Sequence, residues 1–226
     1  MYVGVDITRG GWVFCLTDGR KVFFELSSTF RPHPFPTLVD VPIGLPKDKE
    51  RKCDAIARKI LSKRASTVFP VPCRDAVYQR NYERALRVNR KIQGKGFSRQ
   101  FWNLVTRVRE VDRFLRRKRE YIETVKESHP EICFLFLKKG PLPSKHTVDG
   151  VRVRLEILER YLKSSREKIL KFHEMTKVPI HDLIDACVLA ISQTFKLRSI
   201  PEEPEYDEYG LPMCIFYPVV EKPRYD

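Results

Sequence analysis

One helix in this chain combines a largely apolar surface with two carboxylates, which limits the folds that the chain can adopt. The pattern over Ile180–Lys196 predicts a helix whose apolar residues must be buried against another element. Asp182 and Asp185 are three residues apart and therefore share one face of this helix. Ala186 and Ala190 are small enough to let the helix approach a sheet closely. Burial of such a helix places both acids in the interior or at its rim.

The N-terminal part of the chain predicts the sheet against which that helix can pack. Asp18-Gly19 is a strong signal for a tight turn between two antiparallel strands. β-branched and apolar residues predict five strands in all, namely Tyr2–Asp6, Trp12–Thr17, Lys21–Leu26, Thr37–Val41 and Tyr121–Lys126. The first three are expected to form an antiparallel meander, followed by parallel strands. We therefore expect an α/β fold with a mixed five-stranded sheet flanked by helices.

The helical segments predict a single domain over residues 1–226 with one elaboration. A helical pattern starts near Asp48, and another helix is expected from about Asp149 to His173. Between them, residues 75–120 are expected to form a basic helical insertion that is interrupted by glycines. Residues 199–226 are acidic and rich in proline, and we expect them to form an extended arm.

Basic residues are concentrated in the predicted insertion. The chain has 43 Lys and Arg against 29 Asp and Glu, and residues 84–120 hold 13 basic but only three acidic residues. Such an excess favours a polyanionic partner, usually nucleic acid. The residues predicted to contact phosphates are Arg99, Arg113, Arg116, Arg117, Lys118 and Arg119. A solvated helix face would produce the same basic run, and the aromatic residues beside Arg99 could instead anchor the insertion to the core.

The composition disfavours several classes of protein. No apolar run approaches the roughly 20 residues of a membrane span, and the N-terminal residues are typical of a strand rather than a signal peptide. We therefore expect a cytoplasmic protein without membrane association. The six cysteines are dispersed and form no C-x-x-C pair, which disfavours zinc and redox sites. The sequence also has no P-loop or dinucleotide-binding fingerprint.

Four aspartates form the main candidate site: Asp6, Asp40, Asp182 and Asp185. The first two end predicted strands, and the other two lie on the apolar helix. If the four converge, mutual repulsion and desolvation raise their pKa values, and a bound cation removes that penalty. Mg²⁺ favours such carboxylates, and two ions about 4 Å apart can activate a water molecule and stabilise a leaving oxygen. Each acid also has a structural alternative, since Asp182 could complement the helix dipole and Asp6 could cap a turn.

Several short motifs together resemble a known family. They are Gly4-Val5-Asp6, Gly11-Trp12, Val39-Asp40-Val41-Pro42-Ile43-Gly44-Leu45-Pro46, Arg51-x-Cys53-Asp54, Glu127-x-His129-Pro130-Glu131 and Asp182-x-x-Asp185-Ala186. This set resembles domain-of-unknown-function family 429, which is regarded as a group of predicted nucleases with an RNase H-like fold. The resemblance covers nearly the whole chain. More distantly, the chain is similar to the Holliday-junction resolvases, whose last helix also carries an Asp-x-x-Asp-Ala pattern.

The resemblance implies a role for each acid. Asp6 would lie on the central first strand and bridge the metal ions, and Asp40 would supply the second acid from the adjacent strand. Asp182 and Asp185 would complete the set from the closing helix. Glu127, at the end of the fifth strand, is a further catalytic candidate beside the same edge. Glu131 is expected to start a helix instead.

These observations lead to one main hypothesis and two alternatives. The main hypothesis is a metal-dependent nuclease that uses Mg²⁺ or Mn²⁺, with two ions, on a DNA or RNA substrate. The first alternative is a non-catalytic nucleic-acid-binding protein on the same fold. The second is a relative of the actin-like phosphotransferases, which is disfavoured because such proteins have duplicated domains and Gly-rich phosphate loops. The choice between DNA and RNA and the oligomeric state stay open at this point.

Overall fold

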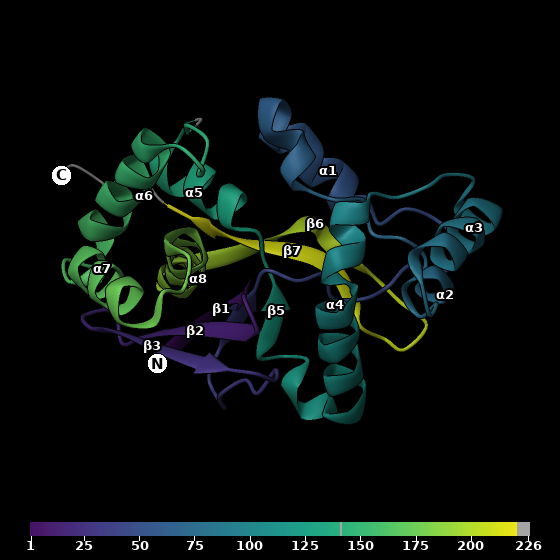
Figure 1. The fold of residues 1–226 in the computed structure, drawn as a ribbon, viewed down its shortest axis with the longest axis horizontal. Helices are drawn as coiled ribbons and strands as arrows, with labels where there is room; N and C mark the ends of the chain where they lie inside the picture. The colour runs from purple at the N-terminus through teal and green to yellow at the C-terminus, as the bar shows by residue number, and fades with distance from the viewer. Residues whose placement is uncertain (141, 221–226) are drawn as a thin grey trace. The chain divides into compact units, whose positions relative to one another are not determined.

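The computed structural model describes residues 1–140 and 142–220 and has an α/β fold (Figure 1). Its strands are β1 (Tyr2–Thr8), β2 (Gly11–Thr17), β3 (Val22–Ser27), β4 (Thr37–Val39), β5 (Val125–Glu127), β6 (Lys196–Tyr206) and β7 (Pro212–Val219). Its α-helices are α1 (Lys52–Leu61), α2 (Arg74–Val77), α3 (Tyr82–Gln93), α4 (Arg99–Arg117), α5 (Pro130–Lys138), α6 (Val148–Tyr161), α7 (Ser165–Thr176) and α8 (Ile180–Ser192). Five strands form one mixed sheet in the order β3-β2-β1-β4-β5, and β6 and β7 form a two-stranded sheet. The expected mixed five-stranded sheet with flanking helices is confirmed.

The chain divides into two compact units. The first consists of residues 1–40, residues 128–198 and the described residues from Phe216 onward. The second consists of residues 41–127 and 199–215, and it contains the basic helices α3 and α4. Among the described helices, none is both long enough and apolar enough to cross a membrane.

The register of the sheet in the first unit places two of the aspartates on neighbouring strands. β1 pairs with β2 in antiparallel fashion and with β4 in parallel fashion. Val5 lies opposite Val39, and the backbone nitrogen of Asp40 donates a hydrogen bond to the carbonyl oxygen of Val5 at 3.0 Å. Asp6 and Asp40 each come directly after one of these paired valines. They therefore emerge at the same level of the sheet.

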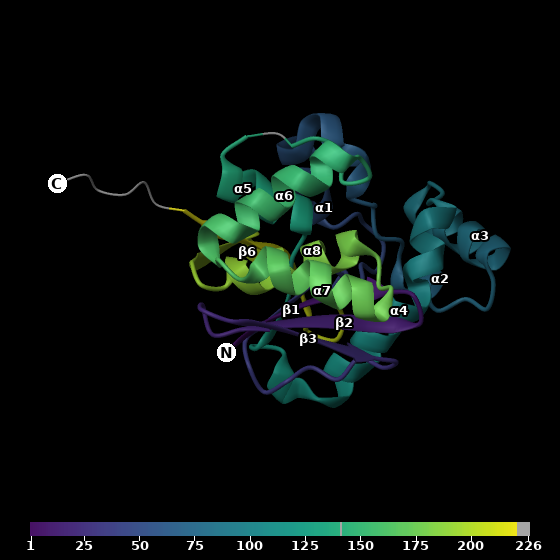
Figure 2. The same ribbon diagram turned by 60° about the vertical axis from the view of Figure 1, so that its left-hand side comes forward.

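Helix α8 lies against β1 and β2, and α6 and α7 pack on α8 (Figure 1 and Figure 2). The approach is very close at Gly4, where an added Cβ would lie 2.0 Å from the carbonyl oxygen of Ala186 and 2.4 Å from the nitrogen of Ala190. Glycine on the strand and alanines on the helix thus allow backbone-to-backbone packing. This packing brings the N-terminal half of α8, with Asp182 and Asp185, to the strand that carries Asp6.

We expect Gly4→Ala to destabilise the protein by about 3 kcal/mol, because the new methyl group would force α8 away from β1. Urea denaturation followed by circular dichroism measures this change. Gly140→Ala is the matched control, since a Cβ at Gly140 would meet no atom within 4 Å. Equal stability of the two variants would contradict the close contact between α8 and β1.

The predicted helix over residues 149–173 is wrong, because the structure has two helices there. Leu162 leaves the helical conformation with φ −149° and ψ 91°, and its side chain is buried. A straight helix over those residues would be about 37 Å long, nearly twice the length of α8. Because the helix is interrupted at Leu162, both α6 and α7 can pack on α8.

Three other segments also differ from the expectation. Residues Arg119–Tyr121 form a 3-10 turn, so β5 is shorter than the predicted strand and begins at Val125. The described part of the predicted acidic arm is not a lone extended arm, because β6 and β7 pair with each other. Residues 221–226 of that predicted arm lie outside the described residues. The predicted closing helix ends at Ser192, and β6 starts at Lys196, where the expected helix had its last residue.

Candidate active site

The four predicted aspartates converge in the first unit. Asp6 lies on β1 and Asp40 directly follows β4, while Asp182 and Asp185 lie in the first two turns of α8. Burial raises the pKa of Asp6 well above its usual range, and the carboxylates of Asp40, Asp185 and Asp182 raise it further. Such mutual effects require the carboxylates to lie near one another in a poorly solvated place. The strand ends and the apolar helix thus meet as the sequence predicts.

Asp40 and Asp182 also have raised pKa values. Burial raises the pKa of Asp40 to about 6, with His129 lowering it and Asp185 raising it. Burial likewise raises the pKa of Asp182, whose Oδ1 lies 3.2 Å from Nε2 of His181. Without a bound divalent cation, Asp6, Asp40 and Asp182 therefore hold protons more tightly than isolated carboxylates do. A divalent cation would reverse this effect by favouring the ionised forms.

A lysine that the sequence analysis missed lies within this cluster. Lys145 Nζ is 2.5 Å from Asp185 Oδ2, and the lysine side chain is 28% exposed. Although burial lowers the pKa of Lys145, the carboxylates of Asp185, Asp6 and Asp40 raise it above its usual range. Lys145 lies in a loop between α5 and α6, where no periodicity or motif marks it. Only the folded chain brings it to the aspartates.

The donor chemistry of the cluster fits a hard divalent cation. Asp185 is fully buried, and its Oδ1 has no hydrogen-bond partner among the described residues. An unpaired buried carboxylate oxygen is costly unless a cation or donor meets it. Within residues 1–140 and 142–220, however, no three His, Cys, Asp or Glu side chains are arranged so as to hold a metal ion. The carboxylates are therefore of the right type for Mg²⁺ or Mn²⁺, while Lys145 is the cation in contact with Asp185.

Glu127 takes part in an ion-pair network of the second unit. Its two carboxylate oxygens accept hydrogen bonds from Arg51 at 2.5 and 2.9 Å, and one of them accepts from the nitrogen of Ile43 at 2.7 Å. Arg51 also binds Asp54 at 2.8 Å. Burial raises the pKa of Glu127 to about 7, although Arg51 lowers it. Glu127 is thus held by three donors, as a structural carboxylate would be.

Glu131 lies in the first turn of α5, where the sequence predicts a helix start. Its Oε1 accepts a hydrogen bond from the buried Arg154 at 2.7 Å. Its charge also contributes to the raised pKa of Asp40, so it lies within electrostatic range of that aspartate. The contact with Arg154 gives Glu131 a structural role.

The six basic candidates all lie on or just after α4 in the second unit, and most of them have a partner there. Arg99 lies 4.3 Å from the ring centroid of Tyr82 and 3.4 Å from Glu83. Arg116 lies 3.4 Å from Asp112, with its guanidinium 3.6 Å from the ring centroid of Tyr209.

The other four basic candidates are more exposed than Arg116. Arg113 lies 5.4 Å from the ring centroid of Tyr78, and Lys118 Nζ is 3.9 Å from Glu120. Arg119 donates to the carbonyl oxygen of Tyr209, and Arg117 is exposed near the end of α4. Arg113 and Arg117 are four residues apart and share one exposed side of this helix.

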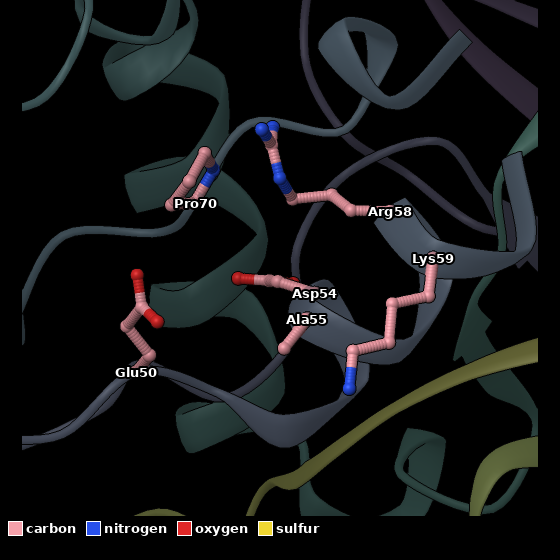
Figure 3. Close-up of a pocket in the computed structure, with 6 residues that line it drawn as sticks. All are labelled: Glu50, Asp54, Ala55, Arg58, Lys59 and Pro70. Atoms are coloured by element: carbon pink, nitrogen blue, oxygen red, sulfur yellow. The ribbon is translucent and has the colours of Figure 1, made fainter. Parts of the chain in front are cut away.

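A separate pocket of about 310 Å³ lies in the second unit (Figure 3). It is lined by Glu50, Asp54, Ala55, Arg58, Lys59 and Pro70. Its main charged groups are already engaged, since Asp54 pairs with Arg51 and Arg58 donates to the carbonyl oxygens of Ala65 and Val68. This pocket therefore offers little free chemistry compared with the aspartate cluster.

Comparison with known proteins identifies a family. A family model described as "Protein of unknown function (DUF429)" matches residues 4–205. No curated protein and no solved structure matches the chain significantly. The matched region contains all four clustered aspartates and Lys145 and covers most of the sequence. The chain therefore belongs to the DUF429 family.

Proposed function

We propose that this protein is a metal-dependent nuclease that hydrolyses phosphodiester bonds of DNA or RNA. The observation that supports the proposal is the convergence of Asp6, Asp40, Asp182 and Asp185 in the first unit. A protein with a net charge of +14 gathers these carboxylates where burial and neighbouring acids raise the pKa values of Asp6, Asp40 and Asp182. That arrangement is costly for an isolated protein and favourable in the presence of a divalent cation.

The chain's own residues would hold and orient the reacting groups. Asp6, on the central strand β1, interacts electrostatically with Asp40, Asp182 and Asp185, so it would be one of the ligands of the cation. Asp185 offers a buried oxygen without a partner among the described residues. Mg²⁺ or Mn²⁺, when bound, would activate water and stabilise the charge that develops on the phosphate. The products would carry a 3′-hydroxyl and a 5′-phosphate.

The proposal includes a nucleic-acid partner and a cytoplasmic location. Arg113 and Arg117 present cations on the exposed side of α4, and Arg84, Arg87 and Arg90 are exposed on α3. Contacts of this kind bind phosphates without reading the base sequence. They suit a nuclease whose substrate is selected by strand structure.

We expect the double variant Arg113→Ala/Arg117→Ala to bind nucleic acid more weakly, by a similar factor for different sequences. The slope of log affinity against log salt concentration should fall by about 1 to 2, because up to two phosphate contacts are lost. Fluorescence anisotropy at several salt concentrations measures both quantities. Lys168→Ala/Lys171→Ala, on α7 of the first unit, is a control with the same loss of charge. The same slope in both double variants would contradict a specific role for α4.

The test of the proposed function is a nuclease assay with Mn²⁺ on single-stranded DNA, duplex DNA, branched DNA, RNA and RNA–DNA hybrids. The wild-type chain should cleave at least one of them, and Asp6→Asn should not. Asp149→Asn, at an exposed aspartate of α6 in the same unit, serves as the matched control and should retain activity. Cleavage that survives Asp6→Asn would place the activity elsewhere.

A non-catalytic nucleic-acid-binding protein is the second candidate. The contact between Lys145 and Asp185 favours it, because a lysine can neutralise part of an acidic cluster without any metal. Isothermal titration with Mg²⁺ and Mn²⁺ separates the two functions. Absence of any binding that depends on the aspartates would favour the second candidate.

A further inference from the structure

Lys145 lies in the aspartate cluster, where a positive charge is needed to neutralise the buried carboxylates. Its ammonium group contacts Asp185 at 2.5 Å and interacts electrostatically with Asp6, Asp40 and Asp182. One positive charge thus contacts Asp185 directly and acts electrostatically on the other three carboxylates. This is the arrangement expected of a bound cation, but here the cation is covalently part of the chain.

The loop that carries Lys145 is held firmly by hydrogen bonds. The hydroxyl group of Thr147 donates to the carbonyl oxygen of Ser144 at 2.8 Å and accepts from the nitrogen of Gly150 at 3.0 Å. A Cβ on Gly150 would lie 1.8 Å from the carbonyl oxygen of Ser144, so the turn can close this tightly only with glycine there. These contacts fix the backbone on both sides of Lys145.

A buried arginine fastens the same loop to α5 and α6. Arg154 is 1% exposed and donates to the carbonyl oxygen of Pro143 at 2.9 Å and to that of Gly150 at 3.0 Å. Its other terminal nitrogen binds Glu131 at 2.7 Å. Lys145 is therefore presented to the aspartates from an anchored turn, unlike a surface lysine that reaches them by chance.

Charge balance limits how many divalent ions the cluster can take while Lys145 stays in place. Four ionised aspartates carry four negative charges, which two divalent ions would neutralise completely. With Lys145 in place, the lysine and one divalent ion together carry three positive charges. The four carboxylates carry four negative charges, so the cluster stays slightly negative. A second ion would make it positive, and it would have to lie beside the ammonium group.

We propose that Lys145 fills one of the two cation positions of the aspartate cluster, so that the site binds a single divalent ion. This inference rests on the proposed function, because it takes the cluster to be a metal site. The ammonium group then performs the charge-neutralising task of the second ion. It has three donors, and those not used by Asp185 can reach a phosphate oxygen of the substrate.

The test is the number of Mn²⁺ ions bound per chain, measured by isothermal titration and by the loss of the free-Mn²⁺ electron paramagnetic resonance signal. The wild-type chain should bind one ion. Lys145→Met removes the charge and keeps the length of the side chain, and it should bind two. Lys168→Met, at an exposed lysine of α7 in the same unit, should bind one. Lys145→Gln provides a second neutral variant if the methionine variant folds poorly by circular dichroism.

Each outcome decides between the inference and the function on which it rests. Two ions in the wild type would overturn the role of Lys145 and leave the nuclease proposal intact. One ion in both the wild type and Lys145→Met would also overturn it. Binding only after removal of Lys145 would make the lysine an inhibitor instead of a partner of the metal. No binding in any variant would overturn the metal-dependent function itself.

Discussion

Asp185→Asn is expected to lower the proposed Mn²⁺-dependent nuclease activity at least about 100-fold, since loss of a group that merely orients a metal ligand already costs 10–100-fold. Asp185 is fully buried, and one of its oxygens has no partner among the described residues. Asparagine keeps the shape of the side chain but removes the negative charge that a divalent cation needs. The measurement is kcat/KM on whichever oligonucleotide the wild-type chain cleaves.

Two controls separate the loss of the proposed metal ligand from a loss of folding. Asp149→Asn makes the same chemical change at an exposed position of the same unit and should keep full activity. Thermal denaturation of Asp185→Asn should still show one cooperative transition, although Lys145 loses its nearest partner. Activity within a few-fold of wild type in a folded Asp185→Asn protein would remove this residue from the candidate site.

Arg51→Met is expected to lower the free energy of unfolding by about 3–5 kcal/mol, the usual cost of breaking a buried ion pair from one side. Arg51 is 1% exposed and binds Glu127 and Asp54. It also donates to the carbonyl oxygen of Ile43 at 3.1 Å. Methionine fills a similar volume, but it leaves two buried carboxylates without their cation. Urea denaturation of the full chain measures the effect.

The neighbouring lysine is the matched control for this prediction. Lys52 pairs with Glu205 at 2.7 Å, but its side chain is 67% exposed. Exposed pairs of this kind contribute about 0–1 kcal/mol, so Lys52→Met should change stability little. Equal effects of the two substitutions would contradict a structural role for the Arg51 network. Such a result would also make a catalytic role for Glu127 plausible again.

Much of the fold could be predicted because it follows local patterns. The first three strands alternate or run apolar around clear turn signals, and α8 is largely apolar with two spaced carboxylates. Both patterns are read over a few consecutive residues, so each strand and helix can be recognised without knowing the others. The break at Leu162 could not be predicted in this way. It depends on the length of α8, the helix on which α6 and α7 pack, and this packing is a feature of the tertiary structure.

The candidate site divides along the same line. The four aspartates of the cluster could be predicted from the sequence. Each lies at a strand end or on an apolar helix that must be buried, so its carboxylate must lie at the edge of the core. Glu127 carries the same local signal as Asp40, but in the folded chain it pairs with Arg51, 76 residues earlier, whereas Asp40 interacts with other aspartates. The sequence pattern of a strand end indicates where a carboxylate lies, but it does not indicate which cation pairs with that carboxylate.

The sequence by itself therefore determined the α/β class of the fold, the mixed sheet and the four aspartates that converge on it. Only the tertiary structure decided which cations face the acids: Lys145 for Asp185, Arg51 for Glu127 and Arg154 for Glu131. The physical reason is that apolar periodicity is a local property of the chain. An ion pair joins residues that are far apart in sequence, as Lys145 and Asp185 are at 40 positions, and it exists only once the chain has folded.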